Sequence, residues 1–260
     1  MIYLIMNYTL EGFINKGSFG HVYKIKDSYN NIWALKIIDN TKYSYNEIDI
    51  LTHIRKSYYG LDINICIMEY YTYNNMYINF MFKYYDSNLS YLVQNYILSS
   101  KDINNICLQI CNGLRYIHKL NIVHCDIKPA NILCNMHNDK QKYIKVAITD
   151  FGLSYYNNTK IYSEVVTSDF RSPEIINCLH YNAIIHIKPA IDMWSFGIVI
   201  YYIIYKKILF EKLDEICIYN YIKRNPILKM KNIKSVMDRL LQYENNRYDC
   251  EKTYILLNKI

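Results

Sequence analysis

The hydrophobic pattern of this 260-residue chain changes near residue 82, and this change limits the possible folds more than any other feature. Before that point the apolar runs have strand length and are separated by polar turns. They cover residues 22–25, 32–38, 64–71 and 76–82. The segment 43–56 differs, because Ile48, Leu51 and Ile54 follow helical spacing. The first part of the chain therefore predicts a small β-rich unit with one helix.

After residue 82 the pattern is mostly helical. Ser100 can cap a helix over 101–120, whose apolar residues recur on one face. Cys107 and Cys111 fall on that face together with isoleucines and a leucine. This favours a buried helix face over a metal site.

The rest of the chain predicts a large, mainly helical unit. Two short strands, 131–134 and 144–148, are joined by a polar hairpin, and an irregular stretch from 150 to 174 follows. The longest apolar run, 193–205, holds about 13 residues, fewer than the ~20 of a membrane span. It predicts a buried core helix.

Composition excludes several classes of protein. Hydrophobic residues make up 52% of the chain, and only 4 Pro and 7 Gly occur, as in a folded domain without a linker. The net charge is +7, but the basic residues are scattered, so we expect no specific nucleic-acid partner. The start of the chain does not resemble a signal peptide, and we expect no membrane association.

Cysteine usage indicates the compartment. The eight cysteines form no CxxC pair and no evenly spaced framework, which favours a reducing, intracellular setting. The 30 tyrosines, with abundant Ile, Asn and Lys, fit an AT-rich genome, such as that of a large DNA virus or an intracellular parasite. We expect a cytoplasmic protein, in the host cytoplasm if it is viral, with the nucleus as an alternative.

The strongest local signal is the segment 124–131, which reads HCDIKPAN. It resembles the catalytic loop H-R-D-L-K-P-x-N of protein kinases. The resemblance implies that Asp126 accepts the proton of the attacking hydroxyl and that Lys128 neutralises the transferred phosphate. Lys128 also marks Ser/Thr rather than dedicated tyrosine kinases. His124 is expected to be structural, packing under the loop and bonding to backbone.

Metal ligands follow from the same resemblance. Asp150 opens an Asp-Phe-Gly triplet directly after a predicted strand, as in the D-F-G element of kinases. Asp150 would bind the Mg²⁺ that bridges the β- and γ-phosphates of ATP, and Asn131 would bind a second Mg²⁺. Mn²⁺ is the alternative metal.

A glycine-containing turn joins the first two predicted strands. The segment 15–22 fits the kinase loop G-x-G-x-x-G-x-V, with Asn15 in place of the first glycine. Glycine lets backbone amides approach phosphate oxygens without a Cβ in the way. The strand–turn–strand context argues against a dinucleotide fold, which needs a helix after the loop. The implied nucleotide-binding residues are Asn15, Gly17, Ser18, Gly20 and Val22.

The next strand carries Trp-Ala-Leu-Lys at 33–36, which matches the strand lysine motif V-A-I-K. Lys36 would contact the α- and β-phosphates, and Glu47 on the following helix would orient it by an ion pair. Phe82 would guard the back of the adenine pocket. Adenine would bond to backbone near Lys83 and Tyr85. It would pack against Val22, Ala34 and Leu133.

The irregular stretch ends in a second set of kinase-like residues. The segment 167–174 resembles T-x-x-Y-R-A-P-E, and Thr167 is expected to hydrogen-bond Asp126 and Lys128. Glu174 needs a buried cation, for which Arg247 is the expected partner. Asp192 opens a D-x-W-S-x-G motif and is expected to anchor the catalytic-loop backbone.

A closer likeness is to the dual-specificity tyrosine-regulated kinases, in the group that includes cyclin-dependent and MAP kinases. HCD in place of HRD, the FRSPE closure and Ile161-Tyr162 carry it. The tyrosine that those kinases autophosphorylate is replaced here by Glu164. We hypothesise that Glu164 supplies a permanent negative charge. Cys125 fits this hypothesis, since it replaces the loop arginine that usually receives an activating phosphate.

Together these features predict one protein kinase domain over residues 1–260, with a bilobal α+β fold. The small β-rich N-lobe with one regulatory helix covers 1–82, the hinge 83–86, and the large helical C-lobe 87–260. The expected function is transfer of the γ-phosphate of Mg-ATP to Ser/Thr hydroxyls of proteins, by a constitutively active monomer. The alternatives are a pseudokinase scaffold, which Asn15 and Cys125 support, and a small-molecule kinase. Lys128 and the S-P-E closure argue against the latter.

Overall fold

The computed structural model describes residues 8–17, 20–41, 44–60, 62–135, 144–210 and 232–260. The chain divides into two compact units. Unit 1 comprises Met1–Leu61 and Cys66–Asp86, and unit 2 comprises Asp62–Ile65 and Ser87–Ile260. One is mainly sheet and the other mainly helix, which is the bilobal α+β class that the sequence predicts.

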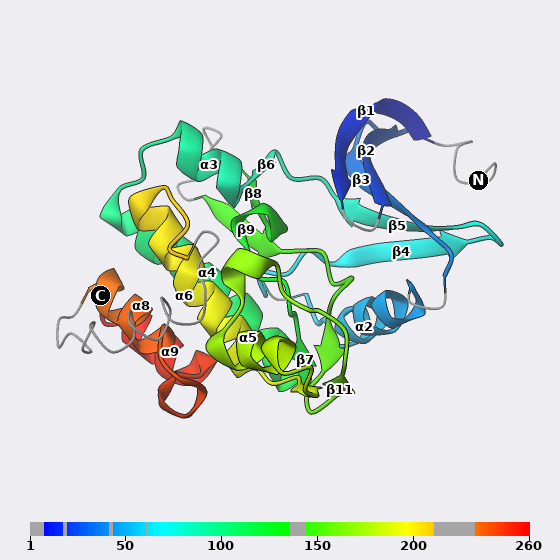
Figure 1. The fold of residues 1–260 in the computed structure, drawn as a ribbon. Coiled ribbons are helices and arrows are strands. Elements are labelled where there is room, and N and C mark those ends of the chain that lie inside the picture. The colour runs from blue at the N-terminus through cyan, green and yellow to red at the C-terminus, as the bar shows by residue number, and fades with distance from the viewer. Residues whose placement is uncertain (1–7, 18–19, 42–43, 61, 136–143, 211–231) are drawn as a thin grey trace. The chain divides into compact units, whose positions relative to one another are not determined.

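Unit 1 is built on a five-stranded antiparallel sheet with the strand order β1-β2-β3-β5-β4 (Figure 1). Its strands are β1 (Tyr8–Gly17), β2 (Gly20–Asp27), β3 (Ile32–Asp39), β4 (Met68–Tyr73) and β5 (Tyr77–Lys83). Strand β5 lies between β3 and β4, and its five inner residues are all buried, which explains its continuous apolar run.

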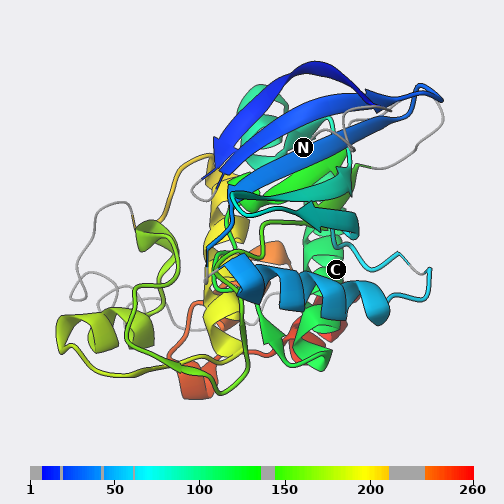
Figure 2. The same cartoon turned by 90° about the vertical axis from the view of Figure 1, so that its right-hand side faces the viewer.

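One helix, α2 (Ser44–Lys56), completes the described part of unit 1 (Figure 2, blue). Leu51 and Ile54 are buried, as their helical spacing predicts, whereas Ile48 is half-buried and Ile50 takes the third buried position. Glu47 is buried on the same helix, and a buried carboxylate requires a partner. That requirement makes Glu47 a functional candidate.

The start of the apolar run 64–71, which the sequence predicts as a strand, is not a strand in the structure. The strand β4 begins only at Met68, and Asp62–Ile65 belongs to unit 2. Asn64 has a left-handed backbone with φ of 56°, a conformation that asparagine tolerates and a strand does not, so the extended run is broken there.

A polar network fixes this segment inside unit 2. The backbone amide of Ile148 donates to the Asn64 carbonyl at 2.9 Å. The Asn64 side-chain nitrogen donates to the Gln109 side chain and to the Val146 carbonyl, both at 3.1 Å. Asn112 donates to Oδ1 of Asn64 at 2.9 Å. A buried amide with this many partners holds its segment firmly.

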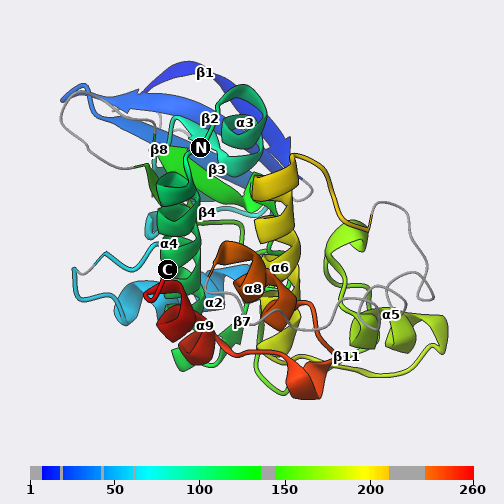
Figure 3. The same cartoon turned by 90° about the vertical axis from the view of Figure 1, so that its left-hand side faces the viewer.

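Unit 2 consists mainly of helices packed around α4 and α6; Figure 3 shows these two side by side, in green and yellow. The described helices are α3 (Leu89–Asn95), α4 (Ser100–Lys119), α5 (Pro173–His180), α6 (Ala190–Tyr205), α8 (Ile233–Leu240) and α9 (Cys250–Leu257). Nearly every residue in the first ten of α6 is buried, which confirms the core helix predicted at 193–205. In the part of the chain that the structure describes, no helix is long and apolar enough to cross a membrane.

The helix α4 begins one residue earlier than predicted. Its N-cap is Ser99, not Ser100, and the Ser99 hydroxyl accepts from the backbone amide of Asp102. The Asp102 carboxylate accepts in return from the Ser99 amide at 3.0 Å. Two adjacent serines can both act as caps, and only Ser99 has an acidic residue three positions later.

Short elements connect the helices of unit 2. Three antiparallel strands, β6 (Ser87–Asn88), β8 (Ile132–Asn135) and β9 (Lys145–Ile148), form one small sheet. Two further pairs are β7 (Ile122–Val123) with β10 (Tyr155–Tyr156), and β11 (Lys160–Ile161) with β12 (Ile185–His186). Short 3₁₀ turns occur at Pro129–Asn131, Ser168–Phe170 and Glu244–Asn246. The loop between β7 and β8 carries the segment 124–131.

Candidate catalytic site

The loop between β7 and β8 is held from below by Asp192, near the start of α6. Its two carboxylate oxygens accept from the backbone amides of His124 at 2.8 Å and Cys125 at 2.9 Å. Asp192 is fully buried, so these charge-assisted bonds are strong. The predicted anchor of the catalytic-loop backbone is confirmed.

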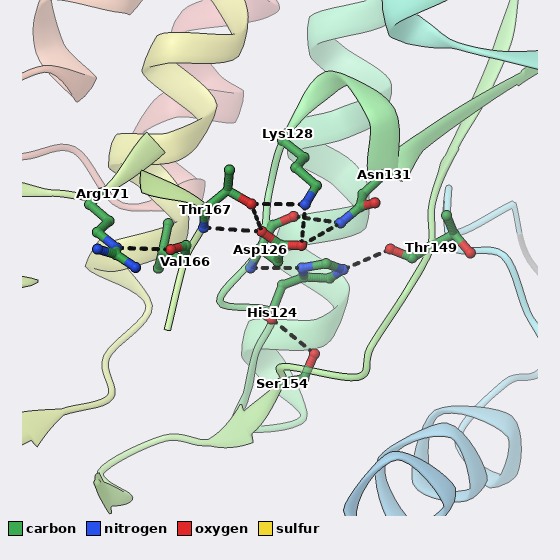
Figure 4. Close-up of polar contacts among 9 residues, drawn as sticks. All are labelled: His124, Asp126, Lys128, Asn131, Thr149, Ser154, Val166, Thr167 and Arg171. Atoms are coloured by element: carbon green, nitrogen blue, oxygen red, sulfur yellow. Dashed lines mark hydrogen bonds and ion pairs between the residues drawn. The ribbon is translucent and has the colours of Figure 1, made fainter. Parts of the chain in front are cut away.

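His124 is structural, as predicted. Its Nε2 contacts the Thr149 carbonyl at 2.9 Å and its Nδ1 accepts from the Asp126 amide at 3.2 Å (Figure 4). Its ring also packs on Phe151. The Ser154 hydroxyl donates to the His124 carbonyl at 3.0 Å. Because both ring nitrogens have partners in the backbone, the ring braces the loop.

The carboxylate of Asp126 is the centre of the site (Figure 4). The Thr167 hydroxyl donates to its Oδ1 at 2.7 Å, and the Lys128 ammonium contacts its Oδ2 at 2.8 Å. Lys128 also donates to the Thr167 hydroxyl at 2.8 Å. The predicted contacts of Thr167 with Asp126 and Lys128 are confirmed, and a base, a cation and a hydroxyl meet at one point.

Asn131 and Asp150 are brought together by the β8–β9 pairing. Ile132 lies opposite Ile148, and the Thr149 amide donates to the Asn131 carbonyl at 3.0 Å. Asp150 is the residue directly after Thr149. The Asn131 side-chain nitrogen donates to the Asp126 carboxylate and carbonyl, both at 2.9 Å. Among the described residues nothing donates to Oδ1 of Asn131, so this hard oxygen can serve as a ligand.

Asp150 has a left-handed backbone with φ of 66°. Such a conformation is costly for a residue other than glycine and clusters at functional sites. Within the described residues, no group of three or more His, Cys, Asp or Glu could hold a metal by itself. Mg²⁺ held by one or two side chains together with phosphate oxygens needs no such group. The donor set fits a nucleotide-bound metal.

Arg171 has contacts in the structure that its sequence motif does not predict. Its guanidinium bonds Oε2 of Glu164 at 2.7 Å, and its Nε donates to the carbonyls of Val166 at 2.9 Å and Val165 at 3.2 Å. Val166 has φ of 65°, an outlier for a β-branched side chain. Arg171 therefore holds a strained peptide directly before Thr167. The closing motif FRSPE contains this arginine, but its partners depend on the backbone path.

The end of the irregular stretch is fixed by an ion pair. Arg247 contacts both carboxylate oxygens of Glu174, at 2.6 and 3.0 Å, as predicted. Burial opposes the charge on Glu174, but the hydrogen bonds from Arg247 outweigh it and lower the pKa of the carboxyl. The same guanidinium donates to the carbonyls of Ala190 and Gln242. It ties α5 to the start of α6.

Unit 1 contains a second group of predicted residues. Lys36 on β3 and Glu47 on α2 form an ion pair of 2.7 Å with both side chains largely buried, which confirms the predicted partner. Strand register places Val22 opposite Lys36 and Ala34 opposite Phe82, so all four lie on one face of the sheet.

The remaining predicted residues have these positions. Asn15 lies opposite Val22, and Gly17 opposite Gly20 at the end of the β1–β2 hairpin. Ser18 lies outside the described residues. Lys83 ends β5, Tyr85 follows it, and Leu133 lies on β8 of unit 2, half-buried. A Cβ on Gly20 would overlap the backbone of Ile37, so the hairpin needs glycine at this point.

Comparison with known proteins adds a family. Residues 8–256 match the protein kinase domain. The chain is 34% identical to the dual specificity tyrosine-phosphorylation-regulated kinase 2 of Drosophila melanogaster over 206 residues, 76% of this chain and 27% of the relative. It is 34% identical to kinase 4 of the same name from Homo sapiens over 192 residues, 71% of this chain and 35% of the relative.

A third relative, dual specificity tyrosine-phosphorylation-regulated kinase 3 of Mus musculus, is 29% identical over 222 residues, 82% of this chain and 36% of the relative. The chain thus spans between 27% and 36% of the length of these relatives. The chain belongs to the protein kinase domain family and is similar within it to the dual-specificity tyrosine-regulated kinases.

Proposed function

We propose that this protein transfers the γ-phosphoryl group of ATP to Ser and Thr hydroxyls of protein substrates, and that it needs no activating phosphorylation. The observation that carries the proposal is the meeting of Lys128, Thr167 and the Asp126 carboxylate at 2.7–2.8 Å. The carboxylate is largely buried and kept in one orientation, as a proton acceptor for an incoming hydroxyl must be.

The remaining residues support the same reaction. Asp126 would accept the hydroxyl proton, while Lys128, which already lies beside the carboxylate, would neutralise charge on the transferred group. Lys36, oriented by Glu47, would hold the α- and β-phosphates. Mg²⁺, with Mn²⁺ as the alternative, would bind Asn131 and Asp150 and offset the negative charge of the phosphates.

Specificity for Ser and Thr rests on Lys128. Its ammonium bonds the Thr167 hydroxyl and the Asp126 carboxylate at once, so it lies beside the expected position of the acceptor hydroxyl. The curated relatives have "dual specificity" in their names, and tyrosine transfer by this chain is therefore an outcome that the assay must score. Adenine would bind at Val22, Ala34, Phe82, Lys83, Tyr85 and Leu133, with the phosphates at Asn15, Gly17, Ser18 and Gly20.

Activity without phosphorylation is supported by the pair of Glu164 and Arg171. The cation that holds the strained Val166 peptide already has an anion, so no phosphate is needed to order the segment. Cys125, buried in place of a cationic side chain, could not receive a phosphate. On this proposal the segment is held by an ion pair within the chain rather than by an added phosphate.

The alternative is a pseudokinase that binds ATP or partners without catalysis. Asn15 and Cys125 favour it. The ion pair of Lys36 with Glu47 and the contacts of Asp126 favour an enzyme, because a scaffold has no need for either. We also propose an intracellular monomer without a specific nucleic-acid partner; none of the described cysteines forms a disulfide, which fits a reducing compartment.

The test uses the full chain produced in bacteria, treated with phosphatase, and incubated with Mg-ATP and a degenerate peptide library. We expect transfer to Ser and Thr peptides, and a loss of at least about a hundredfold in kcat for Asp126→Asn, which keeps the shape but not the charge. Melting temperature checks the fold of the variant. If wild type binds ATP but transfers no phosphate, the pseudokinase reading replaces this one.

A further inference from the structure

A chain of three buried side chains leads from the C-terminal helix α9 to the catalytic loop. The Sγ of Cys250 lies 2.7 Å from Nδ1 of His118, on α4, and Nε2 of His118 lies 2.8 Å from Oδ2 of Asp192, on α6. All three side chains are buried or nearly so. This chain is separate from the residues around the Asp126 carboxylate.

The far end of the chain is the backbone of the catalytic loop. The carboxylate of Asp192 that receives His118 is the one that accepts from the amides of His124 and Cys125. Asp126 is the next residue. Any change in the position of the Asp192 carboxylate is therefore passed to the proposed base through two hydrogen bonds and one peptide.

We propose that Cys250 is a positioning residue that acts on the catalytic loop through His118 and Asp192. The inference rests on the proposed kinase activity only for its kinetic readout. The geometry assigns each atom a role: the Asp192 carboxylate can only accept, so Nε2 of His118 carries a proton. Nδ1 is then left for the sulfur, which fixes the plane of the ring from the opposite side.

The ring is held in its charged form. Burial opposes the charge, but the hydrogen bonds with Asp192 and Cys250 outweigh it and raise the pKa of His118 to about 9. As an imidazolium, the ring donates from both nitrogens, to the carboxylate and to the sulfur. Removing the sulfur removes one of the two partners that favour the charged ring.

Other ionisable groups near this junction come from each element packed on it. From α6 it is Asp192, from α9 Cys250, and from the catalytic loop His124 and the buried Cys125. On α4, the Cys111 thiol donates to the Cys250 carbonyl at 3.4 Å. An ion pair of 2.8 Å between Arg115 and Glu251, with Lys119 at 3.3 Å from the same carboxylate, joins α4 to α9 alongside.

The sign of the pH effect follows from the raised pKa. A group whose folded pKa lies above its ordinary value of 6.5 stabilises the fold fully below that value and loses this contribution as the pH rises through about 9. Removing Cys250 should lower the folded pKa. The stabilisation by the charged His118 is then lost at a lower pH than in wild type, and the hold of Asp192 on the catalytic loop weakens over the same pH range.

The test compares wild type with Cys250→Ala, Cys250→Ser and the control Cys107→Ala. Cys107 is a fully buried cysteine on α4. Its substitution by alanine deletes the same thiol group as Cys250→Ala but leaves the partners of the His118 ring in place. Histidine labelled with ¹⁵N, assigned with a His118→Asn variant, gives the titration of His118 in the full chain. The amide signals of His124 and Cys125 and the pH profile of kcat for Mg-ATP and a Ser peptide are recorded in parallel.

We expect Cys250→Ala to lower the His118 midpoint by about one pH unit, the size expected for one hydrogen bond to a charged ring. The two amides and the alkaline limb of kcat should move with it. Cys250→Ser, whose hydroxyl can replace the sulfur as acceptor, should keep most of the wild-type midpoint, and it serves alone if the alanine variant does not fold. Cys107→Ala should lower the melting temperature and leave all midpoints in place.

An unchanged His118 midpoint in Cys250→Ala would overturn the inference, as would a shifted midpoint that neither amide follows. If wild type transfers no phosphate while the two amides track the ring, the positioning role stands and the proposed kinase activity fails. The spectroscopic arm thus separates the two proposals.

Discussion

At the scale of single residues, the most informative contact is that of Arg171. Its pair with Glu164 has an exposed carboxylate, and such pairs contribute at most about 1 kcal/mol. Its bonds to the Val165 and Val166 carbonyls are different, because they hold a left-handed valine that costs about 1–3 kcal/mol. The arginine should therefore matter more than its acidic partner.

We expect Glu164→Gln to lower kcat of the phosphatase-treated enzyme by about two- to fivefold, since the lost pair is solvent-screened. Arg171→Met, which leaves the Val166 carbonyl without its donor, should lower kcat by at least about tenfold. Initial rates with Mg-ATP and a Ser peptide measure both.

The matched control is Lys188→Met, which breaks the comparable exposed pair with Glu244 away from the site. It should leave kcat unchanged. Full activity of Glu164→Ala before any treatment would rule out the idea of a built-in charge, and equal losses for Glu164→Gln and Arg171→Met would contradict the ranking.

At the scale of elements, Arg247 joins the end of the irregular stretch to two other segments. It bonds Glu174 on α5, the Ala190 carbonyl at the start of α6 and the Gln242 carbonyl after α8. A buried cation with five donors in a fixed plane can serve all three, which lysine cannot. The activation segment is thereby attached to the helical core.

Arg247→Met should destabilise the protein by about 3–5 kcal/mol, because it leaves the Glu174 carboxylate without its partner. Glu174→Gln should cost less. The contribution of the pair has a defined pH window: the pKa of Glu174 is lowered in the folded state, so the pair stabilises above the ordinary value of 4.5 and this contribution is lost as the pH falls through the folded pKa.

Urea unfolding at several pH values checks both statements. The difference in free energy of unfolding between wild type and Glu174→Gln should be constant near neutral pH and shrink below about pH 4.5. A difference that grows on acidification would contradict the assigned direction. Lys188→Met again serves as the exposed comparison, at about 0–1 kcal/mol.

At the scale of the whole molecule, the segment 62–65 is the structural surprise. In sequence it lies between the two parts of unit 1, but it packs in unit 2, where α4 passes close to it. Gly113 makes this approach possible. A Cβ there would lie 2.8 Å from the Asn64 carbonyl oxygen and 2.9 Å from Cδ1 of Ile148.

We therefore expect Gly113→Ala to destabilise the protein by about 1–2 kcal/mol, although alanine is the better helix former by about 1 kcal/mol. The overlap with a backbone oxygen outweighs the gain in propensity. Urea unfolding measures the effect. Gly12→Ala, where a Cβ meets nothing within 4 Å, should stay within about 0.5 kcal/mol of wild type. A more stable Gly113→Ala would show that α4 can move aside.

The sequence could predict the helices at 43–56 and 193–205 from hydrophobic patterning. The partners of Thr167 and the pairs of Lys36 with Glu47 and of Arg247 with Glu174 could be predicted because their motifs resemble those of protein kinases. These contacts are confirmed. Their catalytic roles stay predictions.

What the sequence could not predict depends on the backbone path and on contacts between elements that no motif marks. Asn64 and Val166 take left-handed conformations; asparagine tolerates this one without requiring it, and for valine it runs against propensity. The apolar run 64–71 is typical of a strand, yet the hydrogen bonds of Asn64 hold its start in a non-extended conformation. The contact of Cys250 with His118 joins residues 132 positions apart, and no local pattern signals it.

The position of residues 62–65 also bears on how such a chain can be rearranged. The polypeptide crosses between the two units three times, at 61/62, 65/66 and 86/87. A single splice at 86/87 would therefore not exchange unit 1 alone. It would also replace residues 62–65 of unit 2, which pack against Gly113 of α4. Chimaeras that retain the native tetrapeptide should assemble, and those that replace it should not, so gene shuffling in this chain is constrained by four residues far from the junction.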